Sequence, residues 1–220
     1  MKTPLTKSIP FQNIPNGASS SAYVEKLISF LEQTLPDFSH EKVLQKESSE
    51  NALTEALYKY LTRKARAEGH PFEFQPEKSQ KMPKGHDKRV DMAVRINTCD
   101  IDMEVIYCIE AKKLPTDSPG GAREKEYVSG QTGGIERFKN EAHGKDDAGR
   151  LLPRNGMVAY VTKQGLQHWH KQINQWILNE KWPQNETLIP NYFSPIGMLT
   201  STHLRVSGDK MQLTHFWVII

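Results

Sequence analysis

The sequence has little cysteine and no long apolar run. Its two cysteines, Cys99 and Cys108, are too few for a disulfide framework or a four-cysteine metal site. No segment approaches the ~20 apolar residues that a membrane-spanning helix needs. No apolar stretch follows the first lysines, as a secretory signal would require. We therefore expect a cytoplasmic protein with no membrane partner.

A strong charge of one sign is also missing. The chain has 29 Lys and Arg against 26 Asp and Glu, a formal net charge of +3. This excess does not indicate nucleic-acid binding by itself, although it permits a local basic face. With 37% hydrophobic and 25% charged residues in 220, the composition is that of a folded globular protein with one sizeable core.

The chain order of expected elements predicts an α/β fold. Residues 1–20 are rich in Pro, Ser, Asn and Gly and are expected to form a flexible arm, which leaves 21–220 as a single domain. Apolar periodicity predicts helices at about 22–35, 49–66, 122–127, 134–142 and 164–179. Alternating or continuous apolar runs predict strands at about 72–76, 88–96, 103–112, 156–162, 198–206 and 211–220. Together they predict a mixed sheet flanked by helices, with an added C-terminal β-hairpin.

Two of the expected strands carry acids inside apolar runs. Asp91 lies among Val90, Met92 and Val94, and Glu110 and Lys112 end the run that begins at Val105. Side chains two residues apart on a strand point to the same face. Buried charges are costly unless something pairs with them. A divalent metal ion and a phosphodiester would both supply that pairing.

These motifs resemble the PD-(D/E)xK nuclease superfamily, which has the restriction-endonuclease-like fold. In that pattern an acid on one strand precedes an acid-x-lysine on the next, matched here by Asp91, Glu110 and Lys112. Val90 replaces the proline that often precedes the first acid. Many members carry a further acid on the preceding helix, where Glu50 lies, and some a glutamine after the lysine, where Gln131 lies. The resemblance covers about residues 45–165, and the C-terminal extension 180–220 is outside it.

The resemblance implies a metal centre. Asp91, Glu110, Glu50 and the backbone carbonyl of Ala111 would be the metal ligands, and hard oxygen ligands suit Mg²⁺, with Mn²⁺ able to substitute. The ion would lower the pKa of a bound water and polarise the phosphoryl oxygen. Lys112 would position that water or stabilise the charged transition state. Gln131 would be a further catalytic residue.

Each of these residues also has a simpler interpretation. Glu110 and Lys112 could end an exposed strand and pair with each other across it. Glu50 could be an acid favoured by the helix dipole near a helix start. Gln131 lies in a Gly-rich stretch and could be ordinary loop polarity.

Basic residues flank the motifs and predict contacts to the phosphates of a nucleic acid. We assign this role to Lys81, Lys84, Lys88, Arg89, Arg137 and Lys139. For Arg137 and Lys139 a solvated helix face is the alternative. The predicted function is a Mg²⁺-dependent endonuclease that cleaves DNA in bacterial anti-phage defence or restriction. A ribonuclease and a catalytically inactive nucleic-acid-binding or scaffold protein of the same fold are the alternatives. A homodimer and a partner defence protein are left open.

Overall fold

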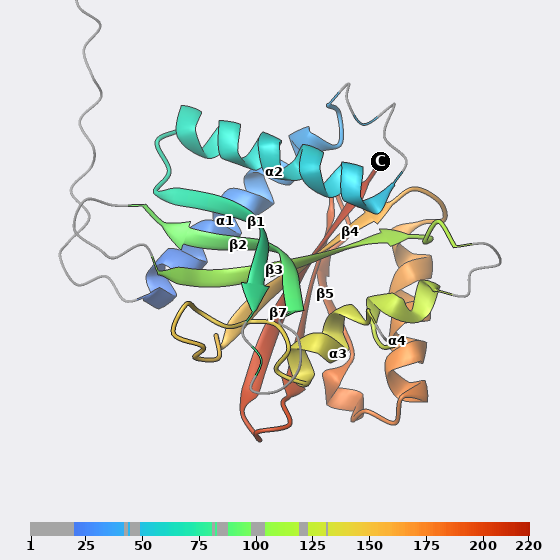
Figure 1. The fold of residues 1–220 in the computed structure, drawn as a ribbon. Coiled ribbons are helices and arrows are strands. Elements are labelled where there is room, and N and C mark those ends of the chain that lie inside the picture. Colours follow the sequence, from blue (N-terminus) through green and yellow to red (C-terminus); the bar gives the residue numbers. More distant parts are fainter. Residues whose placement is uncertain are drawn as a thin grey trace, which may run out of the picture.

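The computed structural model describes residues 20–41, 44, 49–80, 82, 88–97, 104–118, 123–130 and 132–220. Residues 1–19 of the expected arm, Lys81, Lys84, Cys99 and Gln131 lie outside the described residues. Figure 1 shows the elements, which in chain order are α1 Ser20–Phe38, α2 Glu50–Ala67, β1 Phe72–Gln80, β2 Lys88–Ile96, β3 Val105–Leu114, the 3₁₀ helix η3 Glu124–Tyr127, α3 Gly134–Lys139, β4 Arg154–Val161, α4 Leu166–Asn179, the 3₁₀ helix η4 Gln184–Glu186, β5 Ile189–Tyr192, β6 Gly197–Leu204 and β7 Lys210–Ile219.

One seven-stranded sheet organises the molecule, in the order β1-β2-β3-β4-β7-β6-β5. The pairs β3–β4 and β4–β7 are parallel, and the other pairs are antiparallel. The predicted mixed α/β sheet with flanking helices is therefore confirmed. The C-terminal hairpin is part of this sheet, because β7 pairs with β4 along the whole of β4.

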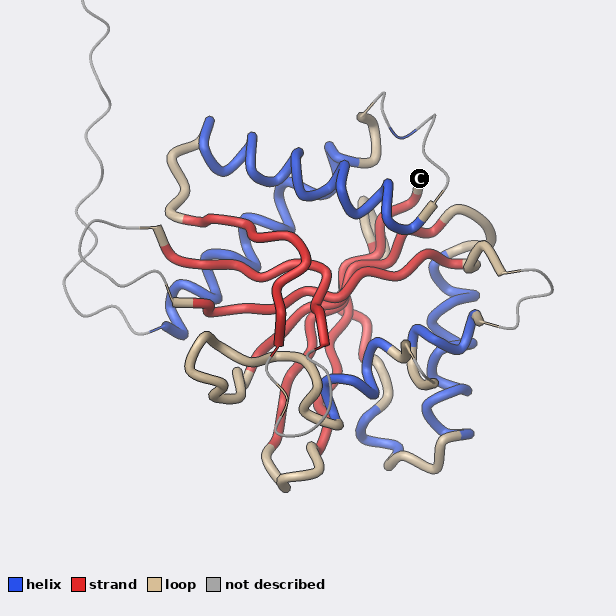
Figure 2. The backbone as a smooth tube through the Cα atoms, viewed as in Figure 1, coloured by secondary structure: helices blue, strands red, loops and turns tan. Residues whose placement is uncertain are grey.

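Helices cover both faces of the sheet, as Figure 2 shows. On one face α1 and α2 bury their apolar stripes against β3 side chains such as Tyr107 and Ile109. On the other face η3, α3 and α4 pack against Cys108, Met157 and Trp217. Strand β3 is buried over all ten residues and β4 over seven of eight. Their nearly continuous apolar runs fit strands that are covered on both sides.

Several elements differ from the expectation, among them α1, β1 and β5. Helix α1 continues through Pro36 to Phe38, because Leu35 and Phe38 are fully buried and packing holds this last turn. Strand β1 extends to Gln80, where a loop was expected, and pairs with β2 along its length. Pro76 is tolerated there because β1 is an edge strand. Strand β5 was missed because it is a short, exposed edge strand.

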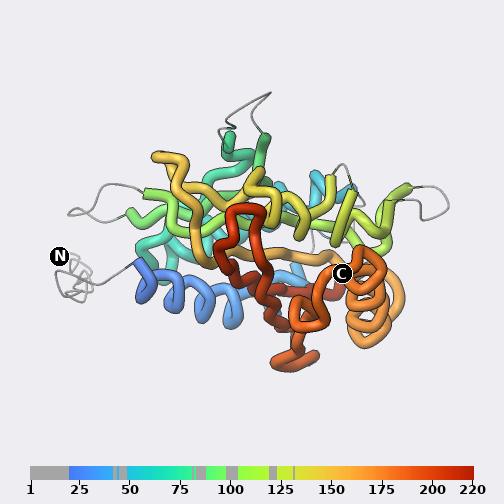
Figure 3. The backbone as a smooth tube through the Cα atoms, turned by 90° about the horizontal axis from the view of Figure 1, so that it is seen from below, coloured from blue at the N-terminus to red at the C-terminus, as the bar shows by residue number. Residues whose placement is uncertain are grey.

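The end of the β6–β7 hairpin lies beside α3. Figure 3 shows the dark red hairpin next to the yellow segment that contains α3. The backbone N–H of Val206 donates to the carbonyl of Lys139 at 3.0 Å. The last forty residues therefore contact the crossover between β3 and β4.

Within the described ranges, no helix combines the length and the apolar character that crossing a lipid bilayer demands.

Candidate active site

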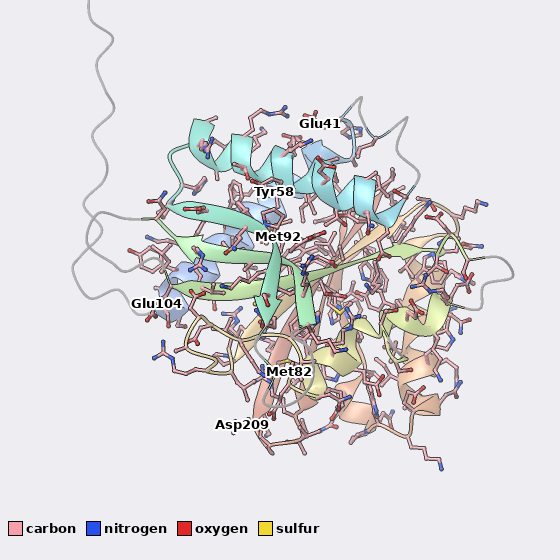
Figure 4. The ribbon with its side chains drawn as sticks, viewed as in Figure 1. Glu41, Tyr58, Met82, Met92, Glu104 and Asp209 are labelled. Atoms are coloured by element: carbon pink, nitrogen blue, oxygen red, sulfur yellow. The ribbon has the colours of Figure 1, made fainter. Side chains whose placement is uncertain are left out.

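The candidate site lies where β2 parts from β3. Met92, labelled in Figure 4, pairs with Ile109 at the end of the β2–β3 ladder. Beyond this point β3 continues to Leu114 and pairs only with β4 on its other side. The backbone N–H and C=O groups along this stretch of β3 therefore need partners other than a neighbouring strand.

Two carboxylates accept from the N–H groups of this stretch. Asp91 Oδ2 accepts a hydrogen bond from the backbone N–H of Ala111 at 2.7 Å. Glu50 Oε2 accepts one from the backbone N–H of Lys113 at 2.9 Å. The side chains of β2 and α2 thus replace the missing strand. The separation of β2 from β3 leaves a place in the sheet where charged groups from several elements meet.

Glu50 occupies the first position of α2. Ser49 caps this helix by accepting a hydrogen bond from the N–H of Ala52 at 3.2 Å. With the cap provided by Ser49, the carboxylate of Glu50 reaches β3 instead, and its other oxygen lies 3.4 Å from Lys112 Nζ. Proximity to the helix dipole alone does not explain these contacts.

The ammonium group of Lys112 is buried among oxygens. Its Nζ lies 2.9 Å from Glu110 Oε1 and 3.0 Å from the carbonyl oxygen of Ala111. Burial alone would lower the pKa of Lys112, but the charges of Glu110, Glu50 and Asp91 outweigh burial and raise it. Lys112 is therefore a fixed cation that stabilises negative charge, not a proton acceptor at neutral pH.

Glu110 is fully buried and has three nitrogen neighbours. Lys112 and Arg137 both contact Oε1, Arg137 through a nitrogen at 3.0 Å. His143 Nδ1 lies 3.2 Å from Oε2, although the two atoms are not aligned for a hydrogen bond. Burial would raise the pKa of Glu110, but Lys112, His143 and Arg137 together hold it at about 2.

The pKa of Asp91 shifts in the opposite direction. Burial, and then the charge of Glu110, raise the pKa of Asp91 to about 7, while Lys112 and the Ala111 N–H act against this rise. The negative charge of Glu110 thus disfavours the ionisation of Asp91 by repulsion. A cation between them would relieve that repulsion.

The fit to a metal ion is partial. Among the residues that the structure describes, no three His, Cys, Asp or Glu side chains form a cluster that could hold a metal. The donor chemistry nevertheless fits Mg²⁺, because Asp91, Glu110 and the Ala111 carbonyl are hard oxygen donors. Glu110 Oε2 is a buried oxygen with no hydrogen-bond partner. In this structure the positive charge beside Glu110 Oε1 and the Ala111 carbonyl is the ammonium group of Lys112.

The structure brings Glu50, Asp91, Glu110, Ala111 and Lys112 together, and their metal and catalytic roles stay predictions. Gln131 cannot be placed, since it lies outside the described residues. His143 was not singled out, and no sequence signal marks it. Lys113, the next residue of β3, is also buried, but it pairs with Asp117.

The expected phosphate contacts divide into two groups. Lys88 and Arg89 are exposed at the start of β2, and Arg89 pairs with Glu77 at 3.1 Å. Arg137 and Lys139 instead point inward, to Glu110 and Glu186 respectively. Both side chains thus already have a carboxylate partner inside the protein, and a phosphate contact or a solvated face would require them to leave it.

The fold and site thus define a mixed α/β protein with a partly buried cluster of carboxylates around Lys112 at a gap in its sheet. Comparison with protein-family models, curated proteins and solved structures gives no match to this chain.

Proposed function

We propose that this protein is a metal-dependent nuclease with a restriction-endonuclease-like fold, and that it hydrolyses DNA phosphodiester bonds with Mg²⁺. The observation that carries the proposal is the meeting of Glu50, Asp91, Glu110 and Lys112 at the gap between β2 and β3. The acids lie on α2, β2 and β3 in the order that the resemblance implies. A setting in anti-phage defence stays a prediction from that resemblance.

The residues of the site would have separate roles. Asp91, Glu110 and the Ala111 carbonyl would hold the ion, which when bound supplies an activated water and a polarised phosphoryl oxygen. Lys112 would stabilise the negative charge that grows on the phosphate in the transition state. Because Arg137 and His143 also contact Glu110, Lys112 can turn toward a substrate without leaving that buried carboxylate unpaired.

One experiment tests this function directly. The purified protein is incubated with Mg²⁺ or Mn²⁺ and supercoiled, linear or single-stranded DNA, or RNA, and compared with Asp91→Asn. Asparagine can still accept the Ala111 hydrogen bond but carries no charge, so the fold should persist while cleavage is lost. Metal-dependent cleavage that is unchanged in Asp91→Asn would place the activity elsewhere. Cleavage of RNA alone would identify the ribonuclease alternative.

A second candidate is an inactive binding or scaffold protein of the same fold. The observation that favours it is that Glu110 contacts three nitrogen-bearing side chains, those of Lys112, Arg137 and His143. A purely structural ion cluster would have the same contacts. Calorimetry with Mn²⁺ separates the two candidates. An active nuclease should bind the ion and lose that binding in Glu110→Gln. An inactive protein should bind nucleic acid without metal and without cleavage.

A further inference from the structure

A chain of buried polar side chains runs through the C-terminal half of the sheet, away from the candidate site. Glu186 Oε2 lies 2.9 Å from His203 Nδ1, and His203 Nε2 lies 2.7 Å from Ser201 Oγ. Ser201 Oγ lies 2.8 Å from His215 Nε2, and His215 Nδ1 lies 2.8 Å from the hydroxyl of Tyr127. These five side chains are almost completely buried. Each of these side chains therefore has to find its hydrogen-bond partners among the other buried groups.

The two ends of the chain fix its direction. Trp217 Nε1 can only donate, and it donates to the Tyr127 hydroxyl at 2.9 Å. At the other end the Glu186 carboxylate can only accept, so His203 Nδ1 carries a proton. Lys139 pairs with the same carboxylate and keeps it ionised.

One arrangement with both histidines neutral satisfies every group. Tyr127 donates to His215 Nδ1, and His215 Nε2–H donates to Ser201. Ser201 then donates to His203 Nε2, and His203 Nδ1–H donates to Glu186. The two histidines thus carry their single protons on different nitrogens, Nδ1 in His203 and Nε2 in His215.

One added proton reverses the chain. If His203 also carries a proton on Nε2, that nitrogen donates to Ser201, and the proton of Ser201 then keeps a partner only by donation to His215 Nε2. His215 then holds its proton on Nδ1 and donates to Tyr127. The Tyr127 hydroxyl already accepts from Trp217. Among the residues that the structure describes, no further acceptor faces the proton of this hydroxyl. A proton gained at His203 therefore leaves an unsatisfied hydroxyl on η3, at the far end of the chain.

The connection of Ser201, His203 and Glu186 also resembles a hydrolase triad. Ser201 is only 3% exposed, and a second histidine occupies the other side of its oxygen. A nucleophile must reach a substrate, so the burial of Ser201 opposes that role.

We propose that the chain from Glu186 to Tyr127 is a two-state proton switch, in which one proton taken up by His203 reverses the three hydrogen bonds between His203 and Tyr127 and leaves the Tyr127 hydroxyl on η3 without an acceptor. Both of its ends contact α3 or a neighbour of α3: Glu186 on η4 pairs with Lys139, and Tyr127 lies on η3. Lys139 belongs to α3, whose Arg137 contacts Glu110, and the carbonyl of Val128, next to Tyr127, accepts from the α3 residue Glu136. The switch itself is independent of the proposed nuclease function.

The neighbouring charges set the pH range. Burial lowers the pKa of His203, which Glu186 on η4 partly offsets and Lys139 on α3 reinforces. Burial, and then His203, hold the pKa of His215 well below 6.5. Ser201, Tyr127 and the ring of Trp182 are the uncharged neighbours. The neutral chain is therefore the state above pH 6.5, and its contribution to stability is lost as the pH falls below that value.

Nitrogen-15 NMR of the histidine rings in the full-length protein tests the switch. At pH 8 we expect His203 to be neutral with its proton on Nδ1 and His215 neutral with its proton on Nε2. As His203 gains its proton in acid, His215 should move its own proton from Nε2 to Nδ1 while staying neutral. The two changes should share one midpoint, which lies below 6.5.

The variant Ser201→Ala should uncouple the rings, so that His215 no longer follows the titration of His203. Ser201→Thr keeps a hydroxyl and should restore the coupling, and Thr202→Ala, an exposed position on the same strand, is the matched control. The wild-type titration alone decides the question if Ser201→Ala does not fold. A charged His203 at pH 8, an unchanged His215 ring across the titration, or unfolding before His203 gains its proton would each overturn the proposal.

Discussion

The carboxylate of Asp91 accepts a hydrogen bond from the backbone N–H of Ala111 at 2.7 Å, at the point where β2 leaves β3. This contact places a carboxyl group of β2 directly against the strand that carries Glu110 and Lys112. It also explains why a buried acid is tolerated there, because Asp91 takes the position of a missing strand partner. The same separation of strands leaves the Ala111 carbonyl free to face Lys112.

Lys112→Ala should abolish most turnover with little effect on DNA binding. The lost charge stabilises the transition state, so we expect kcat to fall by about 10²-fold or more with KM nearly unchanged. Lys113→Ala is the matched control, because Lys113 is adjacent, buried and paired with Asp117 outside the cluster. Equal losses in the two variants, or a lower melting temperature with full turnover, would make Lys112 a structural ion-pair partner.

Glu50→Gln should lower activity by about 10- to 100-fold, because it removes the negative charge that lies beside Lys112 and β3. Glutamine can still accept the Lys113 hydrogen bond, so unfolding by urea should shift little. Glu55→Gln on the same helix, which removes an exposed partner of Lys59, provides the control. If both variants retain full activity, Glu50 is a helix-start acid with no catalytic part.

Affinity for duplex DNA should fall steeply with salt, and Lys88 and Arg89 should account for part of the slope. Replacing both with glutamine should flatten the log–log slope by nearly two units, at about 0.9 per phosphate contact. Lys163 and Lys171, exposed around α4, are the matched pair of controls. Arg137→Gln should instead lower activity without changing the slope, since Arg137 contacts Glu110. A flatter slope in Arg137→Gln would restore its phosphate role.

Acid should weaken the attachment of the loop before β4. Arg95 contacts both oxygens of Asp147, at 2.5 and 2.9 Å, and Lys78 contacts one at 2.5 Å. The Arg95 hydrogen bond, and then Lys78, hold the pKa of Asp147 below 3.8, against the effect of burial. This stabilisation is complete above 3.8 and is lost as the pH falls through the lower folded-state pKa. Melting curves from pH 7 to 2 should show a smaller acid loss in Asp147→Asn than in Asp209→Asn, a control at the hairpin end (Figure 4).

The sequence by itself determined the elements and the central motif. Apolar periodicity placed most helices and strands, because burial imposes the 3.6- and 2-residue repeats directly on the chain. Asp91, Glu110 and Lys112 could be identified because charges inside apolar runs need a partner, wherever that partner lies. The C-terminal hairpin could be identified for a similarly local reason: turn residues are selected by the backbone they must adopt.

Only the tertiary structure decided which groups meet. The separation of β2 from β3 is a property of strand pairing, so no local pattern showed that Asp91 and Glu50 would cap β3. Arg137 and Lys139 looked solvated or phosphate-binding because their partners, Glu110 and Glu186, are 27 and 47 residues away. The chain from Glu186 to Tyr127 joins four elements and needs fixed hydrogen-bond directions, which arise only when the packed fold excludes water from all of its members.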